Sequence, residues 1–190
     1  LEAVVEPQAA AAEDAPTIHD EVPDNVPFRW EAGDEAATDD AFETADETFS
    51  FSLENQRVVP NALDPRGAIA QYRPTTDELT VHLPSQTPFT HQEIMADVLG
   101  HPKRKIRVRS PDVGGGFGSK SMFYPEEALV PFCAMQLERP VKWRETRSEA
   151  FAADEHGRGQ SIETEVAIEN GRVTGLRVRT WGGIGGELGS

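Results

Sequence analysis

The stretch Asp112-Val113-Gly114-Gly115-Gly116-Phe117-Gly118-Ser119-Lys120 places four glycines in five positions around one phenylalanine. Because glycine loses the most backbone entropy on folding, such a cluster indicates backbone that passes where a Cβ would clash. The stretch lies between a basic, strand-like segment, residues 105–109, and a helix that we expect to begin at Pro125. Successive backbone N–H groups at such a junction can point at an anion or a ligand oxygen. The sequence therefore predicts a loop that cradles a cofactor, with a tight structural turn as the alternative.

The spacing of these glycines excludes two common nucleotide-binding motifs. A P-loop ends in Gly-Lys-Ser/Thr, whereas Ser119 separates Gly118 from Lys120 in this chain. The dinucleotide-binding fingerprint fails as well, because its third glycine would fall on Ser119. The sequence contains neither a Gly-x-Ser-x-Gly nucleophile elbow nor a cluster of metal-ligand residues. Residue spacing alone therefore leaves an anion or cofactor loop and a structural turn open.

The net charge of −15 comes from the N-terminal part of the chain. Residues 1–54 hold 16 acidic residues and one basic residue, Arg29, whereas the rest of the chain is neutral overall. We therefore expect no binding to nucleic acid through phosphate neutralisation. The single cysteine, Cys133, excludes an internal disulfide and a cysteine-based metal cage. No apolar run approaches the roughly 18 residues of a membrane-spanning helix, and a cytoplasmic location fits these features.

The prolines and acids of residues 1–33 predict an acidic connector from a preceding N-terminal domain, followed by a folded body over residues 34–190. Phe28 and Trp30 are expected to pin this connector to a larger surface. The missing initiator Met and the ending at residues 185–190 suggest an excerpt of a longer protein.

The periodicity of apolar residues predicts an α+β fold for the body. Helices are expected over 34–45, with Asp34 as the N-cap, over 88–99, with Gly100 as the C′ residue, and from 125 onward, with a helical turn over 147–155. Pro131 should kink the third helix or force it to restart. We expect a half-buried strand over 48–53, a hairpin of 68–72 with 79–83, a short strand over 141–143, and a hairpin of 161–168 with 172–181 around Asn170-Gly171.

The polar pair Ser85-Gln86 lies between a predicted strand and the helix that starts near Pro88, where side chains can reach a site. From spacing alone, a site residue and a turn or capping amide fit Gln86 equally well. His91, in the helix that follows, is expected on the exposed face.

Several further segments accompany the glycine stretch and Ser85-Gln86-Thr87-Pro88. They are Asn61-Ala62-Leu63-Asp64-Pro65-Arg66, Tyr124-Pro125-Glu126-Glu127, Arg139-Pro140-Val141-Lys142-Trp143 and His156-Gly157-Arg158. Together these segments resemble the molybdenum-binding large subunit of the xanthine dehydrogenase/aldehyde oxidase family, in particular its carbon monoxide dehydrogenase type. The resemblance extends over essentially all 190 residues.

The resemblance implies that residues 34–190 form part of the first molybdopterin-binding domain of a molybdenum-dependent oxidoreductase. The implied cofactor is molybdenum–molybdopterin cytosine dinucleotide. Its binding residues would be Gln86, Gly115, Gly116, Phe117 and Gly118. The Gln86 side chain and the Phe117 N–H would donate hydrogen bonds to oxygen ligands of molybdenum, since an amide donates without adding charge.

The resemblance also implies partner subunits and a class of substrate. A small subunit would carry [2Fe–2S] clusters, a medium subunit would carry FAD, and the assembly would be a dimer of heterotrimers. Carbon monoxide or an aldehyde is the expected substrate. An N-heterocycle or xanthine-type hydroxylase and a non-catalytic homologue with the same fold are the alternatives.

This chain departs from the family pattern at two positions near the site. Ser121 stands where purine-hydroxylating members carry a substrate-binding glutamate, which argues against xanthine. Asp64 stands where the family usually has glutamate. The glutamate base and the copper-binding cysteine loop of the family would lie beyond Ser190. We therefore expect no catalytic residue within the chain and no activity from the chain alone.

Overall fold

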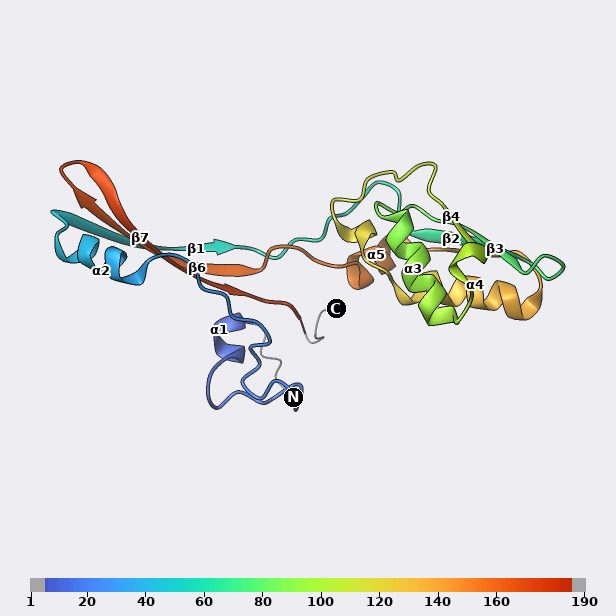
Figure 1. The fold of residues 1–190 in the computed structure, drawn as a ribbon, viewed down its shortest axis with the longest axis horizontal. Coiled ribbons are helices and arrows are strands. Elements are labelled where there is room, and N and C mark those ends of the chain that lie inside the picture. Colours follow the sequence, from blue (N-terminus) through green and yellow to red (C-terminus); the bar gives the residue numbers. More distant parts are fainter. Residues whose placement is uncertain (1–5, 186–190) are drawn as a thin grey trace. The chain divides into compact units, whose positions relative to one another are not determined.

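The structure, a computed structural model, describes residues 6–185. The chain divides into two compact units, one built from residues up to Val58 together with those from Arg158 onward, and one built from Val59–Gly157. Figure 1 shows helices and strands in both units, which confirms the predicted α+β class. Within the described residues, no helix is long and apolar enough to cross a membrane.

The predicted connector over residues 1–33 contains one short helix, α1 (Pro7–Ala10). Its first five residues lie outside the described range, as do residues 186–190. Phe28 and Trp30 are 77% and 74% exposed, so their role as anchors stays a prediction. The boundary predicted before residue 34 also stays a prediction, because the division into two compact units does not test where a domain of the complete protein begins.

In the first unit, three antiparallel strands form a sheet in the order β1-β6-β7. Asn170 and Gly171 have φ angles of 51° and 72°, as the predicted Asn-Gly turn requires, so the hairpin of β6 and β7 is confirmed. Asp34 caps helix α2, as predicted, by accepting a hydrogen bond of 3.0 Å from Ala37 N. The elements are α2 (Glu35–Glu43), β1 (Glu47–Asn55), β6 (Gln160–Glu169) and β7 (Arg172–Gly182).

The strand predicted over residues 48–53 is present as part of β1, but the prediction that it is half-buried is wrong. Phe49, Phe51 and Leu53 share one face of β1 and are 51%, 46% and 52% exposed. Helix α2 packs on the other face of the sheet, beside Gly175. Alternation of apolar and polar residues identifies a strand, whereas burial also requires a second layer, and α2 supplies that layer on the opposite face.

In the second unit, four strands form a sheet in the order β4-β3-β2-β5. Strands β3 and β4 run parallel, and the other neighbouring pairs run antiparallel. The strands are β2 (Gly67–Arg73), β3 (Glu78–His82), β4 (Ile106–Arg109) and β5 (Val141–Arg144). The helices are α3 (Pro88–Leu99), α4 (Pro125–Leu137) and α5 (Arg147–Ala153), with 3₁₀ turns η1 (Lys103–Lys105) and η2 (Ser119–Ser121). The predicted hairpin of β2 with β3 and the predicted helices of this region are confirmed.

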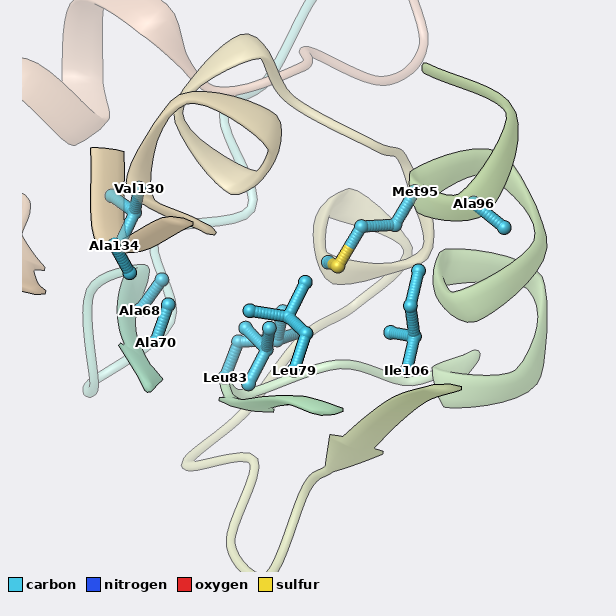
Figure 2. Close-up of a cluster of buried hydrophobic side chains, with 10 residues drawn as sticks. Ala68, Ala70, Leu79, Leu83, Met95, Ala96, Ile106, Val130 and Ala134 are labelled. Carbon is cyan, nitrogen blue, oxygen red and sulfur yellow. The ribbon is translucent and has the colours of Figure 1, made fainter. Parts of the chain in front are cut away.

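The core of the second unit lies between the sheet and helices α3 and α4. Figure 2 shows Ala68 and Ala70 of β2 close to Val130 and Ala134 of α4, while Met95 of α3 extends over the neighbouring strands. Small side chains on β2 let α4 approach the sheet, and the larger Met95 fills the space farther along. This packing fixes the ends of β3 and β4, from which the polar segment 84–87 and the glycine loop emerge.

One local prediction in this unit is corrected, and another is corrected in part. Helix α4 continues through Pro131 without the predicted restart, whereas the predicted kink stays a prediction, and Pro131 is fully buried. Packing of its ring in the core offsets the backbone hydrogen bond that proline removes. His91 is 0% exposed instead of lying on the exposed face of α3. Its ring points toward α4, where Glu127 supplies a buried carboxylate at 3.1 Å.

Candidate functional site

The glycine loop, residues 114–118, takes a backbone path that ordinary residues rarely adopt. Gly114, Gly115 and Gly118 have φ angles of 65°, 92° and 98°, and Phe117 has a φ of 54°. A bulky residue in the left-handed region is uncommon and indicates that the surrounding structure enforces it. The Phe117 ring is 76% exposed, so burial of the ring does not supply the reason for this conformation.

Two of the glycines are required by close approach of other segments. A Cβ on Gly116 would overlap the side chain of Gln86, lying 2.8 Å from its Cγ. A Cβ on Gly114 would overlap the side chain of Asp64, lying 3.2 Å from its Cγ. The glycines therefore let the polar segment after β3 and the loop before β2 pack directly against the loop backbone.

Gln86 is held against the glycine loop by two hydrogen bonds. Its side-chain Oε1 accepts from Gly118 N at 3.0 Å, and its backbone N donates to Lys120 O at 3.0 Å. With Oε1 engaged, the NH2 end of the amide is left to donate, and it forms no hydrogen bond within residues 6–185. The Phe117 N–H likewise has no partner among the described residues. The structure thus brings together the residues that the sequence predicts for one site and leaves two N–H donors available there.

A buried lysine fixes the far side of the loop. Lys120 is 2% exposed, and its Nζ donates to Asp64 O at 2.6 Å and to Val113 O at 2.5 Å. Asp64 N in turn donates to Gly114 O at 3.1 Å. Burial lowers the pKa of the Lys120 amine. Sequence reasoning considered Lys120 only as a P-loop lysine and missed this role.

The loop that carries Asp64 is anchored by a second buried cation, Arg66. Its guanidinium lies 2.7 Å from Glu145, 2.5 Å from Asp154 and 3.3 Å from Glu126. It also stacks over the Tyr124 ring, with 3.6 Å between guanidinium carbon and ring centroid. The sequence predicted the Asp-Pro-Arg turn but not this cluster, because the carboxylate partners of Arg66 lie 60 to 88 residues away along the chain.

The candidate site presents hydrogen-bond donors rather than side chains that coordinate a metal directly. Over the described range, no group of three or more His, Cys, Asp or Glu side chains is arranged to hold a metal ion. The donors near the loop are neutral N–H groups, which suit an oxygen-rich group bound by hydrogen bonds. A bare-backbone cradle with two available N–H donors therefore fits a metal that reaches the protein as part of a larger cofactor.

A family model described as the molybdopterin cofactor-binding domain matches residues 18–188. The chain belongs to this family. The carbon monoxide dehydrogenase large chain of Hydrogenophaga pseudoflava is 35% identical over 195 residues, covering 94% of this chain and 24% of that relative. The nicotine 6-hydroxylase large subunit of Paenarthrobacter nicotinovorans is 36% identical over 180 residues, covering 93% of this chain and 22% of that relative.

Among solved structures, the Cu,Mo-CO dehydrogenase in its carbon monoxide reduced state matches with a TM-score of 0.87 and 29% identity, over 95% of this chain and 24% of that chain. The predicted resemblance to molybdenum-binding large subunits is thereby confirmed. The chain spans about a quarter of the length of these relatives.

Replacing Gly116 by alanine should loosen the loop, because the added Cβ must displace the Gln86 side chain from Gly118. Loss of this hydrogen bond costs about 1 kcal/mol, so we expect amide exchange in a peptide spanning 114–121 to rise roughly fivefold. Hydrogen-exchange mass spectrometry measures this rate. Gly157→Ala is the matched control, since the added Cβ would meet no atom of the described residues within 4 Å. Equal exchange in both variants would contradict the close approach.

Proposed function

We propose that this chain is part of the large subunit of a molybdenum-dependent hydroxylase and holds one side of a molybdopterin cytosine dinucleotide. The observation that carries the proposal is the anchoring of Gln86 on Gly118 N beside a glycine backbone. This anchoring leaves the amide NH2 and the Phe117 N–H without partners within residues 6–185. Membership in the molybdopterin cofactor-binding family supplies the identity of the group that would use these donors.

Each loop residue has a separate task in this proposal. Gln86 and the Phe117 N–H would donate hydrogen bonds to the oxygen ligands of the cofactor's molybdenum. Gly115, Gly116 and Gly118 would present bare backbone to the pterin. Both donors are neutral, so they stabilise negative charge on oxygen without competing as metal ligands. When bound, the molybdenum centre would supply the two-electron oxidation of the substrate. The residues of this chain would bind and orient the cofactor.

Carbon monoxide or an aldehyde is the proposed substrate, with an N-heterocycle as the second candidate. The 35% identity to a carbon monoxide dehydrogenase large chain supports the first. The 36% identity to a nicotine hydroxylase large subunit supports the second equally well. Ser121 offers no carboxylate beside the loop, and Thr87 Oγ1 donates to its backbone O at 3.1 Å, so we disfavour a xanthine-type substrate.

The proposal includes partners that pass electrons onward. An iron–sulfur small subunit with [2Fe–2S] clusters and an FAD medium subunit would complete a heterotrimer, and two heterotrimers would form a cytoplasmic dimer. These partners come from the resemblance of the chain to large subunits of this kind. Purification of the complete complex followed by iron, flavin and mass analysis tests this composition.

Metal and nucleotide analysis of the complete purified protein tests the cofactor directly. We expect about one molybdenum per large subunit and release of a cytidine nucleotide on acid hydrolysis, because the family resemblance implies molybdopterin cytosine dinucleotide as the cofactor. A protein with neither molybdenum nor cytidine nucleotide would be a non-catalytic homologue with the same fold. A panel of carbon monoxide, acetaldehyde, quinoline and xanthine with an artificial electron acceptor then separates the substrate classes.

A further inference from the structure

Gln86 is exposed, and the residues on either side of it are fastened to a buried histidine. Ser85 Oγ lies 3.0 Å from His91 Nδ1, and Thr87 contacts the same ring nitrogen through its backbone O at 2.9 Å and its Oγ1 at 3.3 Å. Thr87 N also donates to Ser85 Oγ at 2.9 Å. One ring atom therefore ties both neighbours of Gln86 to the first turn of α3.

The other nitrogen of the same ring faces helix α4. His91 Nε2 lies 3.1 Å from Glu127 Oε2, within ion-pair distance but without the geometry of a hydrogen bond, and this oxygen accepts from Tyr124 N at 3.2 Å. Both His91 and Glu127 are buried, at 0% and 2% exposure. Acceptors thus lie near both ring nitrogens, an arrangement that favours the doubly protonated imidazolium. Burial alone would lower the pKa of His91, but the Glu127 carboxylate and the backbone carbonyls of Thr87 and Met122 together raise it above its ordinary value.

Packing alone does not explain an ionisable pair at this place. The His91 ring contacts Phe123, with 5.6 Å between ring centroids, and an apolar side chain would make the same contact. A buried ion pair is often no more stabilising than well-packed apolar residues of similar volume. What an apolar residue lacks is the directed contact to the hydroxyl and carbonyl oxygens of Ser85 and Thr87.

We propose that His91 and Glu127 are positioning residues that fix the segment Ser85-Gln86-Thr87 and thereby the direction of the Gln86 amide NH2. The proposal rests on the proposed function, in which this amide serves the cofactor. The Gly118 N–H holds the amide oxygen from the loop side, and the His91–Glu127 pair holds the backbone on either side of the same residue. Loss of the pair should misdirect the amide while leaving the glycine loop in place.

Substitutions at His91 in the complete cofactor-loaded enzyme test this role without requiring a known substrate. The readout is the Mo(V) electron paramagnetic resonance spectrum after partial reduction with dithionite. We expect His91→Leu to shift the spectrum in the same direction as Gln86→Ala. Turnover per molybdenum, on whichever panel substrate the wild type oxidises, should fall about tenfold.

Two conservative variants separate the two ends of the ring. An asparagine amide reaches the Nδ1 side, so His91→Asn should retain the wild-type spectrum better than His91→Gln, whose amide reaches only toward Glu127. His101→Leu is the matched control. His101 is also buried, at 8% exposure, but its Nε2 contacts Asp77 O at 3.2 Å, in the turn before β3. The spectrum of this variant should therefore stay wild-type.

The possible failures are distinguishable. A wild-type protein without molybdenum would overturn the proposed function and the positioning role together. If Gln86→Ala shifts the spectrum while His91→Leu leaves it wild-type, the positioning role alone is overturned. Where His91→Leu does not accumulate, identical spectra for His91→Asn and His91→Gln would also overturn it.

Discussion

Gln86→Ala should lower turnover per molybdenum about 10- to 100-fold in the complete enzyme while molybdenum content stays close to wild type. The amide NH2 would be lost as a donor to the cofactor, whereas the glycine backbone, Lys120 and the Asp64 loop would still form the cradle. Turnover and metal content measured on the same preparation separate these two effects.

A second variant, Gln86→Glu, tests the effect of a negative charge at the same position. Gln86→Glu keeps the oxygen that accepts from Gly118 N but removes both N–H donors and adds a negative charge. It should therefore reduce turnover at least as much as Gln86→Ala. Gln92→Ala is the matched control, because the Gln92 amide donates to Lys103 O in η1 and Ile106 O in β4, not to the glycine loop. Wild-type turnover in Gln86→Ala would reduce Gln86 to a turn amide.

Local patterns predicted the elements whose cause is local. The Asn170-Gly171 turn, the Asp34 cap and the left-handed Gly100 at the end of α3 each depend on neighbouring residues, and each is confirmed. The composition of the chain also predicted the glycine loop. The reason for glycine at position 116 differs from the predicted one, however, because the space beside Gly116 is filled by the Gln86 side chain of the same chain. The sequence predicted that another group approaches the backbone closely at this loop, but it did not identify that group as the Gln86 side chain.

Long-range partners were beyond local patterns. Periodicity treats His91 as a polar residue and places it in solvent, whereas its carboxylate partner comes from α4, 36 residues later. The same limit hid the carboxylates around Arg66 and the carbonyls around Lys120. Such clusters form only when segments far apart in the sequence pack together in the fold. The pattern of a single sequence does not show which of these segments will be neighbours. The buried ionic groups of this unit are therefore its least predictable part.

The most destabilising single substitution that we expect is Arg66→Met. Glu145 and Asp154 have side chains that are 0% and 8% exposed, so removing the guanidinium leaves two buried carboxylates without their cation. Breaking a buried pair in this way costs about 3–5 kcal/mol. Hydrogen-exchange mass spectrometry of peptides spanning 141–154 in the complete protein measures the loss locally. Arg177→Met, at an exposed pair with Asp39, should change exchange little.

Acid should partly rescue the Arg66→Met variant, and the sign follows from Glu145. Burial already raises the pKa of Glu145 above its ordinary value, despite the adjacent Arg66. Without Arg66 this folded-state pKa must rise further, while the unfolded value stays near 4.5. The penalty is therefore complete above the raised folded-state pKa and shrinks as pH falls through it, since protonation removes the buried charge. Exchange in peptides 141–154 should thus differ less between variant and wild type at pH 5 than at pH 8, after correction for intrinsic exchange rates. A difference that is constant with pH would mean that lost packing on Tyr124, rather than uncompensated charge, is the source of the instability.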